Sequence, residues 1–394
     1  MGRAWLLTAV LACAAGSATG GEWSGHVGAE VRAFPHPALS SEQHDIYPGA
    51  VLELEYRERS QDGTGFTFVP FARVDRFDKE RTHADVRELL WSGAGDGYEL
   101  RAGIGRVYWS VMEFAHVVDI VNQTDFVEQL DGRARLGQPM LNLSRQLDGG
   151  VLSGYVLPGF RERTFPGPQG RLRTDPPVDP NRASYESSKR RAHVDWLLRW
   201  SRSGSGWDAG VYAFKGTSRE PRFLPGLDEA GRVVLVPRYD QIDQLGADLQ
   251  ASAGKWVWKL EAIGRKGGDE RFGAYSGGFE YTVVGAFGGR ADVGLIAELM
   301  RDGRGDRAPN FYQDDLGVGL RVALNDAQSS QALIGVLIDR DHRTQLWKLE
   351  ASRRLGDKWK LGLEARYFRD VAREDILFGM REDSYLQVDL ARYF

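Results

Sequence analysis

The sequence contains a single cysteine, Cys13, and it lies in the apolar stretch near the start of the chain. Neither a disulfide framework nor a thiolate metal site can therefore hold the rest of the chain together. Beyond that first stretch, no apolar run reaches the length of a membrane-spanning helix, because 27% of the residues are charged and only 42% are hydrophobic. The formal net charge of −4 argues against nucleic acid as a partner.

Motifs of catalysis are also lacking. The seven histidines are His26, His36, His44, His83, His116, His193 and His342. None of them stands in a nucleophile-elbow or metal-ligand spacing, and no glycine-rich phosphate loop is present. His36 and His44 share one predicted loop with Glu42 and Asp45, which is a weak signal for a divalent cation. The sequence therefore predicts no enzyme, no cofactor and no metal site.

The chain is rich instead in glycine, with 48 residues, and in aromatic residues, with 11 Trp, 14 Tyr and 18 Phe. Apolar and polar side chains alternate along much of it. In residues 23–34, for example, Val27 and Val31 fall on one face while Glu30 and Arg32 fall on the other. A period of two with one apolar face predicts a half-buried β-strand.

Alternation of this kind recurs along the whole chain in runs of about ten residues, the length that a tilted strand needs to cross a bilayer. The predicted strands are 23–34, 50–57, 66–75, 85–91, 98–106, 139–147, 151–160, 192–200, 207–214, 245–252, 256–265, 277–284, 292–300, 316–324, 332–339, 346–354, 359–368 and 385–394. Short turns alternate with longer polar loops. We expect about eighteen strands, or sixteen if residues 139–147 belong to a loop.

Both ends of the chain point to export. Arg3, the apolar residues 4–16 and the small residues 17–20 have the order of a secretory signal, so residues 1–20 are predicted to be cleaved from residues 21–394. A lipoprotein signal ending at Cys13 is the alternative. The last strand places Leu386, Val388, Leu390 and Phe394 on one face, and Phe394 ends the chain.

An alternating strand that finishes on an aromatic residue resembles the closing strand of a Gram-negative outer-membrane β-barrel. Arg392 lies on the same face as these apolar residues, where this group of barrels usually has an apolar residue. Its long side chain can reach the lipid headgroups. The resemblance is to the broad porin-like group, which includes specific porins and alginate-export-type barrels. It implies an all-β, antiparallel transmembrane barrel in the outer membrane, in contact with lipid and lipopolysaccharide and inserted by the barrel-assembly machinery. A secreted β-sandwich or solenoid is the alternative.

The insertion 109–136 carries too many apolar residues for a freely solvated loop. It is the third outward loop, and porins commonly fold their third loop inward to constrict the pore. By that resemblance, we expect Asp119, Asn122, Asp125 and Glu128 to face the passage, opposite wall arginines such as Arg101 and Arg106. An outward lid on the barrel rim is the alternative.

The inward parity of the strands carries charges of both signs. Further pore-lining candidates are Arg32, Arg199, Glu261, Arg321, Glu350 and Arg366. We expect most inward charges to pair across the wall and a minority to select solutes. The insertion 161–191 is basic and proline-interrupted, which predicts a mobile, solvated extracellular loop whose arginines attract lipopolysaccharide phosphates or an anionic solute.

The sequence thus predicts an outer-membrane channel for passive or facilitated passage of small polar or amphipathic solutes. The alternative is a barrel plugged by its third loop that acts in structure or surface interaction. The solute, the direction of transport and the oligomeric state, monomer or trimer, are left open.

Overall fold

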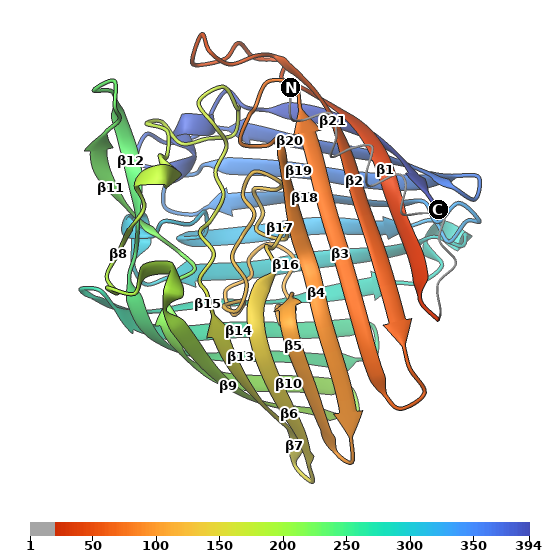
Figure 1. Ribbon diagram of the computed structural model, residues 1–394. Coiled ribbons are helices and arrows are strands. Elements are labelled where there is room, and N and C mark those ends of the chain that lie inside the picture. The colour runs from red at the N-terminus through yellow and green to blue at the C-terminus, as the bar shows by residue number, and fades with distance from the viewer. Residues whose placement is uncertain (1–19) are drawn as a thin grey trace.

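Eighteen antiparallel strands close into one barrel in the computed structural model, which describes residues 20–394 (Figure 1). The barrel strands are β1 (Glu22–Ala33), β2 (Ile46–Arg59), β3 (Thr64–Asp75), β4 (His83–Gly95), β5 (Tyr98–Gly105), β6 (Gln138–Leu147), β7 (Gly150–Pro158), β9 (Val194–Gly204), β10 (Trp207–Thr217), β13 (Gln241–Ala253), β14 (Trp256–Gly267), β15 (Glu270–Val283), β16 (Asp292–Asp302), β17 (Asp314–Ala323), β18 (Gln331–Asp339), β19 (Gln345–Leu355), β20 (Trp359–Arg369) and β21 (Tyr385–Tyr393). The barrel closes where β1 pairs with β21, with Ala29 opposite Leu390.

The two ends of the barrel differ in their connections. Tight turns join β4 to β5, β6 to β7 and β13 to β14, and Figure 1 shows the first two at the lower end of the view. Gly97 and Gly254 sit in two of these turns with φ of 70° and 63°, a region that glycine adopts without steric cost. The long connections 34–45, 106–137, 159–193 and 218–240 all lie at the opposite end, which we call the long-loop end.

The barrel exposes its apolar face and buries its polar face. On β14, Trp258 and Leu260 are 50% and 45% exposed on the outside, whereas the next residue, Glu261, is fully buried. This polarity is the reverse of a soluble protein and matches a wall between lipid and an aqueous lumen. Among the described residues, no helix is both long and apolar enough to span a membrane.

The prediction of eighteen strands is confirmed, and sixteen is wrong because β6 pairs with both β5 and β7. Apart from Gly20, the predicted signal segment lies outside the described residues. The sequence reading missed a small sheet of β8 (Ser184–Tyr185), β11 (Arg222–Leu227) and β12 (Val233–Tyr239) at the long-loop end. Its strands are short and carry Pro225 and Pro237, which obscure the alternation.

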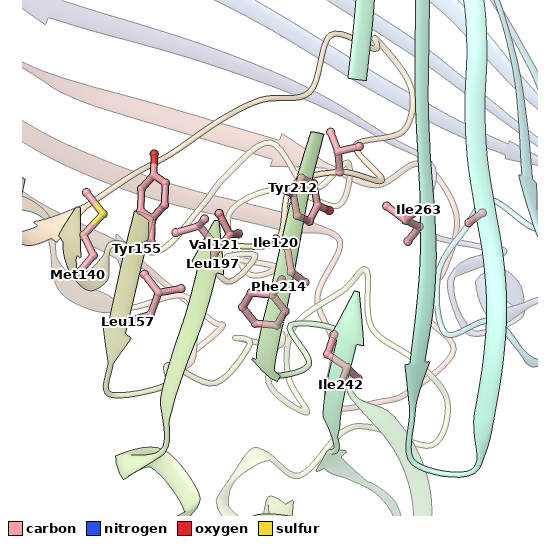
Figure 2. Packing of buried hydrophobic residues seen from close by; sticks show 12 residues of the cluster. Ile120, Val121, Met140, Tyr155, Leu157, Leu197, Tyr212, Phe214, Ile242 and Ile263 are labelled. Carbon is pink, nitrogen blue, oxygen red and sulfur yellow. The ribbon is translucent and has the colours of Figure 1, made fainter. Parts of the chain in front are cut away.

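The segment 106–137 between β5 and β6 packs against the inner wall. Its Val118, Ile120 and Val121 are almost fully buried and join a cluster with inward side chains of seven neighbouring barrel strands, including Leu197 and Phe214 (Figure 2). Burying each apolar side chain is worth about 1.5–3 kcal/mol. This internal core therefore holds the segment against the seven strands β6, β7, β9, β10, β13, β14 and β15.

Candidate functional site

Two buried carboxylates of the barrel wall fix the start of segment 106–137. Glu261 on β14 accepts hydrogen bonds from the Ser110 hydroxyl at 2.6 Å and from the Val111 backbone N–H at 2.7 Å. Glu298 on β16 accepts from the backbone N–H groups of Glu113 and Phe114 at 2.8 and 2.9 Å. A segment without secondary structure must find partners for its backbone, and these wall carboxylates supply them.

The Phe114 ring fills a recess that the wall leaves open. Gly317 on β17 and Gly335 on β18 face this ring, and a Cβ atom on Gly317 would come within 2.5 Å of it. The Lys348 ammonium lies 4.6 Å from the ring centroid, a distance typical of a cation–π contact. Because Gly317 and Gly335 have no side chains, the wall has a socket there for the Phe114 ring.

Glu113 next to this ring binds three cations. Its carboxylate contacts Lys348 at 3.0 Å, Arg321 at 2.7 Å and also Arg133 from the same segment. Burial alone would raise the pKa of Glu113, but the attraction of Lys348 and Arg133 prevails and lowers it to about 2. Glu113 therefore stays ionised and ties the segment to β17 and β19.

The far part of the segment contacts the opposite wall. Glu128 pairs with Arg73 of β3 at 2.7 Å, and Asp125 pairs with Arg87 of β4 at 2.6 Å. Asp131 contacts Arg366 of β20 at 3.3 Å. The segment is thus attached to β14, β16, β17, β19 and the adjacent β20 on one side and to β3 and β4 on the other, and it crosses the barrel interior (Figure 1).

The four polar residues predicted to face the passage bind the backbone of the segment or arginines of the barrel wall. Asp119 accepts from the backbone N–H groups of Trp109 and Ser110 at 2.9 and 3.1 Å. Asn122 is 2% exposed and bonds the backbone of Val107, Gly105 and Leu136, while Asp125 is fully buried. The prediction that Asn122 and Asp125 face the passage is wrong. An irregular segment uses its polar side chains to bind its own backbone and the wall.

The predicted opposition to wall arginines fails for Arg101, whereas Arg106 lines the middle hollow described below together with Glu128. Arg101 pairs with Glu99 two residues away on the same strand face, at 3.0 Å, and Arg106 pairs with Glu88 at 3.0 Å. A guanidinium group can reach a carboxylate on the same face of its own strand or of the neighbouring strand, so these pairs form without the loop. Besides the cations around Glu113, the wall cations that the segment engages are Arg73, Arg87 and Arg366.

Three hollows follow one another along segment 106–137. The outer hollow, about 140 Å³, lies between the segment and the long-loop end and is lined by Asp119, Arg135 and Phe311 among others. The middle hollow, about 210 Å³, shares Arg135 with it. The inner hollow, about 570 Å³, shares Arg133 with the middle one and continues to His26 near the tight-turn end. Together they outline a candidate path past the segment.

The middle hollow is lined mainly by cations. Among the described residues that line it are seven arginines, Arg32, Arg73, Arg81, Arg87, Arg106, Arg133 and Arg135, and three glutamates, Glu53, Glu128 and Glu364. Several carboxylate partners of these arginines, such as Asp75 and Glu88, are not part of the lining. The middle hollow thus presents guanidinium groups to its interior.

The remaining predicted pore residues divide into two sets. Arg32 and Glu128 line the middle hollow, and Arg321 and Glu350 line the inner one. Three others are buried in structural contacts. They are Glu261, described above, Arg199, which bonds Asp248 at 2.6 Å, and Arg366, which bonds Glu350 at 2.9 Å.

Sequence reasoning missed Arg133 and Arg135, which line the path from the segment itself. The available signal was the spacing of the two arginines, which lie two residues apart after Gly132, a turn position with φ of 75°. In an extended stretch this spacing places both guanidinium groups on one side. It also missed Arg81 and Arg87. Arg81 precedes β4, and the alternation of β4 is irregular because its pairing with β3 shifts register at Val69 and Pro70.

The insertion 161–191 is more ordered at its centre than predicted. Arg171 is 4% exposed, pairs with Asp383 and stacks over Phe34 at 4.5 Å from the ring centroid. The prediction of a solvated arginine is therefore wrong there, because Asp383 and the Phe34 ring replace water around its guanidinium. Arg182 and Arg190 in the same insertion are exposed.

One group of ligand-type side chains comes together among the described residues, and it does not include His36 or His44, which gave the weak cation signal in the sequence. His83, Asp125 and Glu128 place one ligand atom each within 4.8 Å of one another. Arg87 and Arg73 already pair with the two carboxylates. Because two guanidinium groups neutralise these ligands, the cluster is poorly suited to a cation.

No protein-family model matches the sequence, and no curated protein matches it. Solved structures do match. A BenF-like porin from Pseudomonas fluorescens Pf-5 superposes with a TM-score of 0.54 at 10% identity, over 95% of this chain and 97% of that one. Pseudomonas aeruginosa OpdO gives 0.52 at 10% identity, over 95% and 96%. Pseudomonas aeruginosa OccK8 (OprE) gives 0.52 at 12% identity, over 95% and 97%. At these identities the likeness shows a shared fold, and this chain has the fold of a porin-like β-barrel.

Proposed function

We propose that this chain is an outer-membrane channel through which small polar or amphipathic solutes pass without an energy source. The proposal rests on two features together. The wall is apolar outside and polar inside, and segment 106–137 leaves three neighbouring hollows beside it, each sharing lining residues with the next. The first feature suits a lipid-embedded barrel, and the second suits a narrowed rather than a filled lumen.

The arginines of the middle hollow carry the proposed selectivity. Guanidinium groups give bidentate, charge-assisted hydrogen bonds to carboxylates and phosphates. Since the three glutamates of that hollow are outnumbered, anions enter it more readily than cations of the same size. The proposed preference is therefore for small anionic or amphipathic solutes over cations. It replaces the sequence-based expectation that Asp119, Asn122, Asp125 and Glu128 face wall arginines across the passage, because Asn122 and Asp125 are buried.

Purified protein in a planar bilayer tests this function. A tenfold KCl gradient across the bilayer should give a reversal potential of the sign set by chloride permeation. A cation-selective reversal potential would contradict the proposed selectivity. A folded barrel that carries no current at all would favour the alternative, in which the third loop plugs the lumen.

A further inference from the structure

The outer wall of β6–β15 carries an apolar surface with alternating ridges and furrows. One register row runs across six neighbouring strands and alternates large and small residues: Leu143, Gly154, Leu198, Ala213, Leu245 and Gly264. Leu198 and Leu245 are 53% and 66% exposed, so this row faces outward. The glycine and alanine positions form furrows between leucine ridges, and together they bound a hollow of about 970 Å³.

The next register row, one step toward the long-loop end, is apolar on β6, β7 and β9, where it carries Leu141, Val156 and Trp196, and polar on the four strands that follow. It places Lys215, Asp243, Lys266 and Arg271 side by side on β10, β13, β14 and β15. Neighbouring strands lie about 4.8 Å apart, so these side chains form one continuous line. Lys215 is paired with Asp243 at 3.0 Å. Within residues 20–394, Lys266 and Arg271 have no carboxylate within 4.0 Å, and both are exposed.

The height of this charged row fits the headgroup level of the outer leaflet. The Trp256, Trp258, Phe279 and Tyr281 side chains form an aromatic cluster at the tight-turn end. From Trp256 to Lys266, β14 covers about 33 Å at ~3.3 Å per residue. A strand tilt of about 40° converts this to a height of about 25 Å, which is the thickness of the apolar band of such barrels.

We propose that this face of the barrel is a binding site for one phosphorylated outer-leaflet lipid, the lipid A portion of lipopolysaccharide. Its acyl chains lie in the furrows at Gly154, Ala213 and Gly264, and its phosphates bind Lys266 and Arg271. Charge complementarity favours this occupant over a second copy of the chain, which would bring its own cations against these. The proposal depends on an outer-membrane location but not on whether the barrel conducts.

Two variants separate the two halves of the site. Lys266→Gln with Arg271→Gln removes both phosphate-binding charges from exposed positions. Gly264→Leu fills a furrow, and it should leave the wall intact because a Cβ atom at Gly264 meets nothing within 4 Å. Arg392→Gln is the matched control, since Arg392 is an exposed basic residue on the outward parity of β21 near the tight-turn end.

The experiment is native mass spectrometry of the detergent-solubilised full barrel titrated with diphosphorylated lipid A. We expect a one-to-one adduct that survives competition by excess phosphatidylglycerol. The adduct should fall about tenfold or more in the double variant, because two charge-assisted contacts are lost. It should also fall in Gly264→Leu and persist in Arg392→Gln.

Three results would overturn the site. They are equal binding by the double variant, displacement by phosphatidylglycerol at equal concentration, and oligomers of the chain in place of lipid adducts. Conductance measured on the same samples reports on the channel separately, so loss of one property does not mimic loss of the other.

Discussion

Arg133 shows at the scale of one residue how anchoring of the segment is combined with the proposed selection of anions. Its guanidinium contacts Glu113 within the segment and Glu350 of β19 at 3.0 Å. Its side chain is nevertheless 32% exposed and lines both the middle and the inner hollow. A partly exposed cation at the junction of two hollows acts on every solute that passes between them.

Replacing Arg133 by Gln should therefore reduce the preference for anions. The permeability ratio of chloride to potassium should fall roughly two- to fivefold, because one of the cations that line the middle hollow is removed. Reversal potentials in a KCl gradient measure this ratio. Arg145→Gln is the control, since Arg145 is exposed on the outer face of β6. An unchanged ratio in Arg133→Gln would show that the path runs elsewhere.

His116 makes the docking of the segment sensitive to pH. Burial lowers the pKa of His116 to about 4, and the nearby Arg135 acts in the same direction. A released segment would have a histidine pKa near 6.5. Protonation therefore favours release, so the docked state is fully stable above pH 6.5 and loses stability as the pH falls from 6.5 toward 4. Glu113, with a pKa of about 2, stays ionised throughout this window.

We expect current fluctuations to increase as the pH is lowered from 7 to 5, as the segment detaches more often. His116→Gln keeps a polar contact for the Ser110 hydroxyl, which lies 2.8 Å from Nδ1 of His116, but cannot titrate. The variant should lose the pH dependence in this range. Noise recordings at fixed voltage provide the measurement, and an identical pH profile in the variant would assign the effect to another group.

At the scale of elements, the strands could be predicted from the sequence and the segment that narrows the lumen could be predicted only in part. Alternation along β14 and β21 reports two environments directly, because each side chain faces either lipid or lumen. Segment 106–137 has no period. Its apolar content indicated burial, but its partners, such as Glu261 and Glu298, lie more than a hundred residues away. No local pattern encodes such long-range pairs.

The Phe114 socket gives a prediction for the segment as an element. Phe114→Ala removes a ring that is 6% exposed, which costs about 3 kcal/mol of docking energy. Gly317→Ala should act in the same direction, because its Cβ atom would clash with the ring at 2.5 Å. Both variants should raise the mean conductance and the current noise in single-channel records.

Gly154→Ala is the matched control for the socket. It faces the outside, and its Cβ atom would meet only the Leu143 carbonyl at 4.0 Å. Its conductance should equal that of the unmodified chain. If Phe114→Ala and Gly317→Ala also conducted normally, the segment would not depend on the socket for its position.

At the scale of the whole molecule, the barrel has an inverted distribution of polarity and an internal core. The apolar outer face cannot stabilise the barrel in water, and the inner wall is held by charged pairs and by the cluster around Ile120 and Leu197. The segment thus stabilises the wall as well as narrowing the lumen, because its apolar residues bury the inner apolar patch of β6, β7 and β9. Removal of residues 106–137 should therefore destabilise the barrel rather than simply widen it.

The most direct test of the central claim is single-channel conductance of the mature protein in a planar bilayer under asymmetric KCl. The account predicts steady current steps that scale with voltage, with a reversal potential that indicates a preference for chloride. A correctly folded, heat-modifiable barrel that passes no current would contradict the claim that a path remains open beside segment 106–137.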